Sequence, residues 1–338
     1  MTNPSVHASR PLPADDHAWV VTPTGVDVRL RCLAVVDHRT VWAAGANGVV
    51  LRTENGGAAW QPVGPAGADA LHFRSIRAFD ATHAVALTFG SGEAARIFAT
   101  ADGGVHWTET FRNRDPAAFY DCMTFADRRH GLALADPVEG RFRLMGTSDG
   151  GRTWSPVDPQ GMPPALDGEA AFAASGTCLV SHGGQYWFAT GSAARARVFR
   201  SFDLGRTWQV ADTPIRTVRD AGIFALSFRS PAEGVAVGGD YTDQTRPGRL
   251  LAVTRDGGGT WRAVEDHAPP AYRSGAVWTG HAFLVVGPTG SEVSVDDGLT
   301  WTTFDTSSFD AVSRGGDGSC WASGEHGRVA RLVAPTAN

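Results

Sequence analysis

The sequence contains no lysine, because all 30 of its basic residues are arginine. Its 35 acidic residues give a net charge of −5, and like charges form no long run. Binding to duplex nucleic acid or to an anionic membrane surface requires a basic patch, so the sequence disfavours both kinds of partner. The exclusive use of arginine indicates a codon bias rather than a binding role.

Long apolar stretches are also missing. No segment approaches the roughly 18 to 20 apolar residues that cross a membrane, and residues 1–16 lack the apolar core of a signal peptide. We therefore expect no membrane insertion and, for the chain as written, a cytoplasmic protein. A mature exported protein whose signal had been removed would look the same, so export is the alternative.

Cysteine is scarce, and metal-binding spacings are absent. Cys32, Cys122, Cys178 and Cys320 stand singly, without a C-x-x-C pair, and the 11 histidines form no H-E-x-x-H motif. These patterns predict four buried, unpaired thiols and no metal site. No G-x-G-x-x-G follows a strand, so we expect no dinucleotide and no other cofactor.

The residues that are abundant favour a fold built from strands. The chain has 41 Gly, 19 Pro and 11 Trp among 338 residues. Short apolar runs such as 41–45 and 283–287 alternate with turns rich in glycine. This composition is typical of many short strands joined by tight turns.

One eight-residue pattern recurs along the chain. It has Ser or Thr at its first position, Asp at the third (Asn in the first copy), Gly at the fifth and Trp at the eighth. The copies are 53–60, 100–107, 147–154, 201–208, 254–261 and 294–301. The carboxylate can accept backbone N–H groups, Gly supplies a positive φ, and Trp packs against the sheet. Six copies cannot converge on one catalytic site, so we interpret the pattern, which is that of the Asp-box, as a structural hairpin.

The spacing of the repeated Trp residues predicts a propeller. Successive spacings are 47, 47, 54, 53 and 40 residues, around the length of a four-stranded blade. A seventh unit begins at about residue 309, but the chain ends before its fourth strand. Residues 17–22 resemble the strand that follows an Asp-box. We therefore predict an all-β, seven-bladed propeller of four-stranded antiparallel blades, in which the N-terminal strand completes the last blade.

This interpretation divides the chain into a flexible segment 1–16, a single propeller 17–332 and a tail 333–338. The expected blades are 28–63, 71–110, 118–157, 169–211, 222–265, 271–304, and 309–332 with 17–22.

With these repeats, the chain resembles the BNR/Asp-box propellers, and more closely the Ycf48-like photosystem II assembly factors and their non-photosynthetic bacterial relatives. Segments 136–142, 168–177 and 237–241 look like those of the non-photosynthetic relatives, which are often labelled oxidoreductase or sialidase-like. The resemblance spans about residues 17–332. It implies the fold strongly and an activity only weakly, because its motifs belong to the scaffold.

Two enzyme classes that share the repeat fit poorly. A sialidase would have six blades and an early Arg-Ile-Pro, which this sequence lacks. Glycosidases of this class that cleave plant glucans use two propellers, whereas this chain is long enough for one.

Alignment of the blades identifies a candidate site at one mouth of the central channel. The same position near the start of the innermost strands holds Arg31, Arg74, Asp121, Gly176, Phe224, Arg273 and Asp310. We call these the ring positions. The next residue is small in every blade, as close packing near the axis requires.

Charges at these positions must be paired, hydrated or bound to a ligand. One interpretation is a solvated ion network. The other is a ligand site in which Arg31, Arg74 and Arg273 bind an anionic group and Asp121 accepts protons from hydroxyl or amine groups. From their loop positions we expect further residues on the same face, namely Tyr120, Asp136, Glu169, Asp220, Asp240, Tyr241 and Tyr272.

Two functions follow. The first is a binding or assembly scaffold, with a polar or anionic ligand or a protein partner at a site of Arg31, Arg74, Tyr120, Asp121, Tyr272, Arg273 and Asp310. The alternative is a glycoside hydrolase or lyase acting on an anionic or carbohydrate-like substrate. Its candidate catalytic residues are Asp121, Asp136, Glu169, Asp240 and Tyr241. Two carboxyl groups, or a Tyr and a carboxylate, facing each other in a concave pocket would favour the enzyme.

Overall fold

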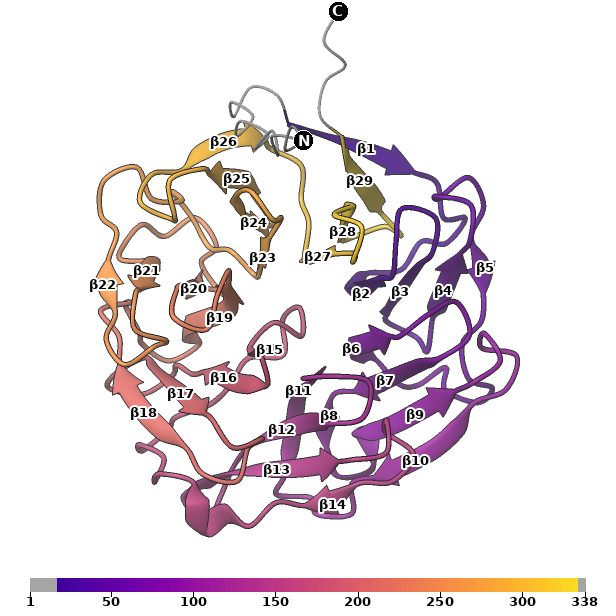
Figure 1. The fold of residues 1–338 in the computed structure, drawn as a ribbon, viewed down its shortest axis with the longest axis horizontal. Helices are drawn as coiled ribbons and strands as arrows, with labels where there is room; N and C mark the ends of the chain where they lie inside the picture. Colours follow the sequence, from indigo (N-terminus) through magenta and orange to yellow (C-terminus); the bar gives the residue numbers. More distant parts are fainter. Residues whose placement is uncertain (1–16, 334–338) are drawn as a thin grey trace, which may run out of the picture.

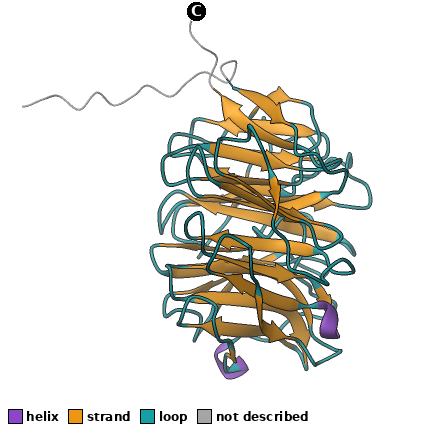
Figure 2. Ribbon diagram, turned by 90° about the vertical axis from the view of Figure 1, so that its right-hand side faces the viewer, coloured by secondary structure: helices purple, strands orange, loops and turns teal. Residues whose placement is uncertain are grey.

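The computed structural model describes residues 17–333, which form seven antiparallel sheets arranged as blades around a central axis (Figure 1). The expected segment 1–16 and most of the expected tail 333–338 lie outside the described residues. In each blade the chain runs from an innermost strand outward, and the next blade begins again near the axis. Figure 2 shows the sheets edge-on. The predicted seven-bladed propeller is confirmed.

The first three blades contain these strands. Blade 1 is β2 (Leu30–Val35), β3 (Val41–Gly45), β4 (Val50–Thr53) and β5 (Gln61–Pro62). Blade 2 is β6 (Phe73–Ala78), β7 (Ala84–Thr88), β9 (Arg96–Thr100) and β10 (Thr108–Arg112). Blade 3 is β11 (Phe119–Phe125), β12 (Gly131–Val138), β13 (Arg141–Thr147) and β14 (Ser155–Pro156). A short additional strand, β8 (Gly90–Ser91), pairs with β11, and two 3₁₀ turns occupy Gly92–Ala94 and Pro159–Gly161.

The remaining blades follow the same plan. Blade 4 is β15 (Leu179–His182), β16 (Gln185–Ala189), β17 (Arg197–Ser201) and β18 (Gln209–Asp212). Blade 5 is β19 (Ala221–Phe228), β20 (Gly234–Asp240), β21 (Leu251–Thr254) and β22 (Arg262–Ala263). Blade 6 is β23 (Gly275–Trp278), β24 (Phe283–Gly287), β25 (Gly290–Ser294) and β26 (Thr302–Asp305). Blade 7 is β27 (Ala311–Arg314), β28 (Cys320–Ser323), β29 (Val329–Val333) and β1 (Ala18–Thr22).

The two ends of the described chain meet in blade 7, as predicted. Strand β1 pairs with β29 in an antiparallel register that runs from Ala18↔Val333 to Thr22↔Val329. The Trp19 indole donates a hydrogen bond to Ser291 of blade 6 and lies 5.2 Å from the Phe309 ring, centroid to centroid. The N-terminal strand therefore supplies the outer strand of blade 7 and covers the exposed edge that β29 would otherwise present.

Each repeated turn is held by its own side chains. In the third copy, Asp149 Oδ1 accepts hydrogen bonds from the Thr153 and Arg152 N–H groups, and Oδ2 accepts one from the Thr153 hydroxyl. Burial raises the pKa of Asp149, but these hydrogen bonds outweigh it and leave the pKa at about 2. The carboxylate is thus fully used within the turn, which agrees with a structural role.

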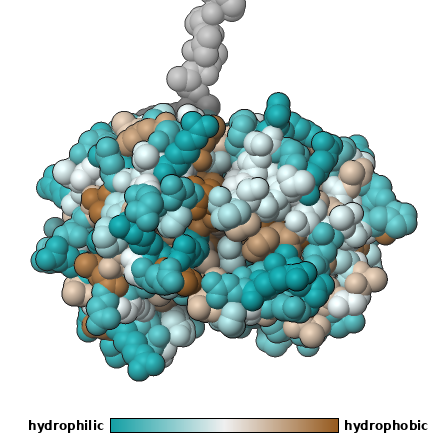
Figure 3. Space-filling model, turned by 90° about the horizontal axis from the view of Figure 1, so that it is seen from below, coloured by the Kyte–Doolittle hydropathy of each residue, from teal (hydrophilic) through white to brown (hydrophobic). Residues whose placement is uncertain are grey.

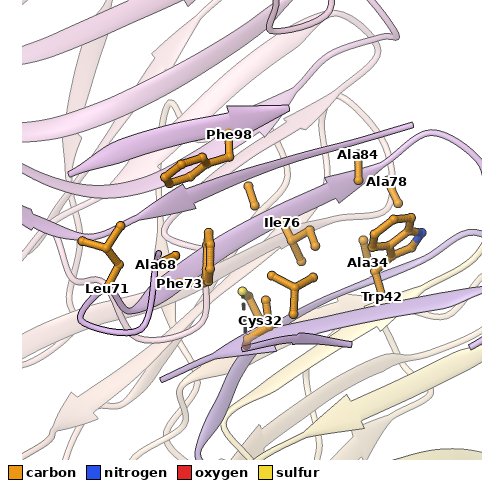
Figure 4. Packing of buried hydrophobic residues seen from close by; sticks show 13 residues of the cluster. Cys32, Ala34, Trp42, Ala68, Leu71, Phe73, Ile76, Ala78, Ala84 and Phe98 are labelled. Atoms are coloured by element: carbon orange, nitrogen blue, oxygen red, sulfur yellow. Dashed lines mark hydrogen bonds between the residues drawn. The ribbon is translucent and has the colours of Figure 1, made fainter. Parts of the chain in front are cut away.

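The hydrophobic core lies between neighbouring blades rather than in one central mass. Figure 4 shows the cluster between blades 1 and 2, where Trp42, Phe73, Ile76 and Phe98 are buried together. The Trp107 ring of the second repeated turn packs edge-on against Trp42, 6.3 Å between centroids. Because each blade buries its faces against two neighbours, closure of the ring stabilises every interface.

The outer rim carries no broad apolar face on the side drawn in Figure 3, where hydrophilic colours dominate and apolar residues form small patches. No helix within residues 17–333 is long and apolar enough to cross a membrane.

Candidate functional site

The ring positions share a local backbone feature. Arg31, Arg74, Asp121 and Phe224 are each the extra residue of a β-bulge between the two innermost strands of their blades. A bulge interrupts the alternation of a strand and re-aims the side chain of the extra residue. The sequence alignment therefore selected positions that are structurally equivalent in blades 1, 2, 3 and 5.

Blade 4 departs from this plan. Its innermost strand begins only at Leu179, and residues 170–177, which we call the plug, reach into the centre of the ring ahead of β15 (Figure 1). Arg74 Nε of blade 2 donates to the Ala173 carbonyl at 2.9 Å, and the Ser175 hydroxyl donates to the Ser274 carbonyl of blade 6 at 2.6 Å. The plug therefore contacts blades on opposite sides of the channel, and residues 170–174 form part of the wall of a cavity there.

This central cavity has a volume of about 460 Å³. Its charged and polar lining includes Arg29, Arg31, Asp121, Asp136, Ser192, Asp220, Tyr241, Gln244, Tyr272 and Asp310. Aromatic rings of Phe89, Phe119, Phe172 and Phe224 complete the wall together with plug alanines. The volume lies within the usual range for small-ligand pockets, and the mixture of apolar walls with a few polar groups is typical of them.

The Phe172 ring of the plug stacks on Phe224 of blade 5, with centroids 4.1 Å apart and an interplanar angle of 12°. Phe224 in turn contacts Tyr272 edge-on at 4.7 Å. These rings are buried with Ala174 in one small cluster. The cluster fixes the plug against blades 5 and 6, and so holds one wall of the cavity in place.

Asp310 is engaged by an arginine that the sequence interpretation did not select. Arg29 donates from Nε to Asp310 Oδ2 at 2.8 Å and from Nη2 to Oδ1 at 2.6 Å, and its Nη1 lies 3.2 Å from Glu325. Hydrogen bonding to Asp310 raises the pKa of Arg29 despite partial burial. Arg29 lies two residues before the ring position Arg31. Because residues two apart in a strand point to the same side, this spacing was the only feature of the sequence that could have indicated Arg29 as a site residue.

Arg31 lies in the same cavity and makes no hydrogen bond or ion pair with any residue between 17 and 333. Burial lowers its pKa, and the nearby Asp310 offsets this only in part. Arg74 is not one of the residues that line the cavity, but its guanidinium carbon lies 3.9 Å from the centroid of the ring of Phe89, which does line it. Burial, and then repulsion from Arg31, lower the pKa of Arg74 to about 9. Two of the three expected ring arginines thus lie close enough to influence each other.

Asp121 and Asp136 form the acidic side of the cavity. Asp121 is the bulge residue between β11 and β12, and Asp136 occupies a second bulge between β12 and β13. Asp136 Oδ1 accepts the Ala171 N–H of the plug at 2.8 Å, whereas Asp121 Oδ2 is buried without a hydrogen-bond partner among the described residues. Burial, followed by the negative charge of Asp136, raises the pKa of Asp121 well above its usual value. Burial raises the pKa of Asp136 to about 6.

Arg273 does not join this group, which corrects the predicted convergence of three arginines. It is only 1% exposed and forms a bidentate ion pair with Glu292 of its own blade. Its Nη1 also donates to the Thr289 hydroxyl and the Tyr272 carbonyl, each at 2.8 Å. A buried carboxylate on β25 requires a cation, so Arg273 turns into blade 6 rather than toward the axis.

Glu169 and Asp240 are likewise internal to their blades. Glu169 forms a bidentate ion pair with Arg197 and accepts the Thr190 hydroxyl at 2.6 Å. Asp240 accepts the Thr242 N–H and hydroxyl and lies 3.1 Å from Arg246. Burial raises the pKa of Asp240, but these contacts outweigh it and the net shift is downward. Neither carboxylate lines the central cavity, so their selection as catalytic candidates has no support from geometry.

The three tyrosines selected from the sequence lie in different environments. Tyr241 is 46% exposed at the cavity rim, and its hydroxyl donates to Asp220 at 3.2 Å. Tyr272 lines the cavity, where burial and then Asp310 raise its pKa. Tyr120 is buried against Phe111 between blades and does not line the cavity.

Cys122 and Cys178 form a disulfide between blades 3 and 4, with Cα atoms 6.7 Å apart. The prediction of four unpaired thiols is therefore wrong for these two, although Cys32 and Cys320 are free and buried. Cys122 follows the ring position of its blade by one residue and Cys178 by two. The two cysteines therefore occupy nearly the same position in adjacent blades, and this position, rather than their separation in the sequence, was the signal that could have predicted the disulfide.

Within residues 17–333 no group of three or more His, Cys, Asp or Glu could hold a metal ion.

A larger groove of about 730 Å³ lies at the rim between blades 2 and 3. Two of its charged side chains are ion-paired, Arg128 with Asp80 at 2.6 Å and His106 with Asp102 at 2.7 Å, and its other arginines, Arg129 and Arg152, are exposed to solvent. Because the central cavity instead contains Arg31 and the buried Asp121, for which the described residues provide no hydrogen-bond or ion-pair partner, we consider it the better candidate site despite its smaller volume.

Comparison with known proteins agrees with this architecture. The structure of YCF48 bound to D1 peptide superposes with a TM-score of 0.65, covering 94% of this chain and 95% of that one at 14% identity. The chain is structurally similar to Ycf48. YCF48 from Cyanidioschyzon merolae gives the same score and identity, with 99% of its chain covered. The GH74 xyloglucanase of Xanthomonas campestris gives 0.59 at 14% identity, but this chain spans only 53% of that enzyme.

No family model and no curated protein matches the sequence. At such identities the similarity to Ycf48 establishes the fold alone.

Proposed function

We propose that this protein is a non-enzymatic binding scaffold that takes an extended segment of a partner protein in the central cavity. The observation that carries the proposal is the presence of Arg31 and Asp121, both unpaired, in one aromatic-lined cavity. We also infer that the six repeated turns are Asp-boxes of the BNR type, so that they serve the scaffold and leave binding to the cavity face.

Unpaired charges at this depth are unfavourable until a ligand supplies the missing partner. A polypeptide can offer backbone N–H and C=O groups and side chains of both signs, and its apolar side chains can contact Phe119, Phe172 and Phe224. Tyr241, which lines the cavity and is 46% exposed, adds an aromatic ring that a partner can reach from solvent. A small polar or anionic ligand would meet the same charges and is the other occupant to test.

The structural neighbour gives independent support at the level of the fold. YCF48 is seen bound to D1 peptide, so a propeller of this architecture can bind a polypeptide segment. The sequence resemblance to Ycf48-like assembly factors points in the same direction. We propose the general part of that role, which is the binding of a partner protein.

Panning a random linear-peptide phage library on the immobilised protein tests the proposal. We expect the enriched peptides to lose at least about tenfold in affinity for Arg31→Met, which removes the charge and keeps the volume, and for Ala173→Trp, which fills the cavity. Arg195→Met is the matched control, because Arg195 is 64% exposed and pairs with Asp212 at the surface. Failure to enrich any peptide, or equal binding to all variants, would contradict the proposal.

An enzyme acting on a carbohydrate-like substrate is the second candidate, and the pair of carboxyl groups favours it. The half-buried Asp136, whose pKa is raised to about 6, could donate a proton near neutral pH, with Asp121 as its acidic neighbour. It is placed second because Asp121 has no hydrogen bond that would orient it for catalysis. Hydrolysis of aryl glycosides that is lost in Asp136→Asn and retained in Glu139→Gln would favour the enzyme over the scaffold.

The disulfide gives information about the cellular compartment of the protein. Disulfides persist in oxidising compartments and are rare in a reducing cytoplasm. The Cys122–Cys178 bond therefore favours the exported alternative over the cytoplasmic expectation. Fractionation of the native host with an antibody against the folded protein tests this proposal.

A further inference from the structure

We propose that Asp121 and Asp136 form a subsite for a primary ammonium group carried on an apolar or aromatic stem. The inference rests on the proposed function of the central cavity as a binding site, and it adds the chemical class of one part of the ligand.

The strongest observation is a contrast among buried acidic side chains. Within the described residues, four of the five buried carboxylates have an arginine partner: Glu169 with Arg197, Asp240 with Arg246, Glu292 with Arg273, and Asp310 with Arg29. The fifth, Asp121, is 1% exposed and has none. The fold supplies a cation wherever it buries a carboxylate permanently, so the missing cation at Asp121 indicates one that arrives with a ligand.

The geometry directs both carboxyl groups to the same place. Asp121 and Asp136 occupy consecutive bulges on β11 and β12, and both line the central cavity. Asp136 uses Oδ1 to accept the plug N–H of Ala171, which leaves Oδ2 without a partner in residues 17–333. Asp121 Oδ2 is also unpartnered. An ammonium group has three N–H donors and can satisfy both oxygens at once.

The surrounding residues favour an organic cation over a metal ion. Calcium requires six to eight oxygen ligands, and the described residues provide no cluster of three acidic or metal-binding side chains here. Aromatic rings are abundant instead: Phe119, Phe172, Phe224 and Tyr241 line the same cavity. Their faces attract a cation and their area accommodates its apolar stem.

The site should bind the ammonium group more tightly as the pH rises. Burial raises the pKa of both carboxyl groups, that of Asp136 to about 6, so protons compete with the ammonium group in mildly acidic solution. The other charged or titratable groups facing the cavity are Arg29, Arg31, Asp220, Tyr241, Tyr272 and Asp310. On the neighbouring β13, Arg143 is engaged by Glu139 at 2.9 Å. Asp310 accepts hydrogen bonds from Arg29, and Asp220 accepts one from the Tyr241 hydroxyl. Neither carboxylate therefore lacks a partner in the way that Asp121 does.

Isothermal titration calorimetry with phenethylamine provides the test. We expect saturable binding to the full-length protein near pH 8 that weakens at least about tenfold near pH 5, since both carboxyl groups must then release protons. Asp121→Asn and Asp136→Asn should each weaken binding at least about tenfold. Glu139→Gln is the matched control, since Glu139 lies at the turn between β12 and β13 but is 85% exposed, and it should bind like the wild type. The thermal melting of each variant, measured in parallel, reports whether it is folded.

Three further probes separate the explanations. N-acetylphenethylamine has the same ring without the charge, and equal binding of it would overturn the proposal. So would binding of phenethylamine that is unchanged in Asp121→Asn, or tight binding of calcium alone that displaces the amine. Nα-acetyl-lysine amide presents the ammonium group as a partner's side chain would, and its binding through the same carboxyl groups would assign the subsite to a lysine of the partner. If both amines fail while panned peptides still depend on Arg31, the ammonium subsite is wrong and the binding scaffold stands.

Discussion

Arg29 and Asp310 join the first blade to the last through two hydrogen bonds, Nε to Oδ2 at 2.8 Å and Nη2 to Oδ1 at 2.6 Å. The pair lies at the cavity, where the innermost strands β2 of blade 1 and β27 of blade 7 begin. Because both oxygens of Asp310 are taken by Arg29, the neighbouring Arg31 is left without a partner of its own. One ion pair thus both secures the ring and leaves a positive charge available at the mouth of the channel.

Asp310→Asn should therefore destabilise the protein by about 2 kcal/mol, because it leaves Arg29 with only the partly exposed Glu325 as a counterion and removes a nearby negative charge from Arg31. Urea unfolding measures the loss. A double-mutant cycle with Arg29→Met isolates the pair: we expect the two substitutions to be strongly non-additive. Additive effects would mean that Arg29 and Asp310 stabilise the protein through separate contacts.

The disulfide leads to a second prediction. Cys122 and Cys178 are 56 residues apart in the chain and connect the inner strands of blades 3 and 4. Replacing both with Ala should lower the free energy of unfolding by about 2 to 4 kcal/mol, as expected for a cross-link that closes a long loop. Cys320→Ala is a control in which a free, buried thiol is lost. Peptide mapping without reductant should recover residues 122 and 178 in one linked fragment, and finding both as free thiols would contradict the assignment.

The scaffold could be predicted from the sequence because its signals are local and repeated. Each Trp and Gly of the repeated turns marks a hairpin, and their spacing gives the blades. Closure by residues 17–22 followed from a missing strand at one end of the chain and an unassigned one at the other. The bulge positions at Arg31, Arg74 and Asp121 were also found, because the register between the two innermost strands needs no information from other blades.

The pairing of charges could not be predicted, because it depends on which side chains meet across neighbouring strands and blades rather than on their alignment position. Arg273 shares its alignment position with Arg31, yet Glu292 on the same blade engages it. The plug is a further example: its anchors, Arg74 and Ser274, are about a hundred residues away on either side. Alignment therefore gives the candidates for a site, and contacts within and between the blades decide which of them remain unpaired.

Truncation tests the closure of the ring. A chain beginning at residue 25 lacks β1 and should lose about 3 kcal/mol or more of stability relative to a chain beginning at residue 17, because β29 becomes an open edge and the packing of Trp19 on Phe309 is lost. Thermal and urea unfolding of the two chains measure the difference. Identical melting curves would show that blade 7 is stable with three strands.

The last prediction concerns pH and follows from the two acidic bulge residues. Burial raises the folded-state pKa of Asp136 from 3.8 to about 6, and that of Asp121 also lies above its usual value. The folded protein therefore holds these protons more tightly than the unfolded chain does. Their contribution to stability is fully present below about pH 4 and is lost as the pH rises through the folded pKa, about 6 for Asp136.

Asp136→Asn removes this penalty while its amide oxygen can still accept the Ala171 N–H. Relative to the wild type, the variant should be more stable by about 1 to 3 kcal/mol near pH 8 and equally stable near pH 4. Urea unfolding at both pH values measures the difference, and Glu139→Gln controls for the loss of one surface charge. The direction of the stability change distinguishes Asp136 from an ion-paired carboxylate such as Glu169. Neutralising Glu169 would leave the buried Arg197 without its counterion, and should therefore destabilise the protein near pH 8. A variant less stable than the wild type near pH 8 would mean that the Asp136 carboxylate is stabilised by favourable contacts in the folded protein. The cavity would then not contain two carboxyl groups that lack a positively charged partner.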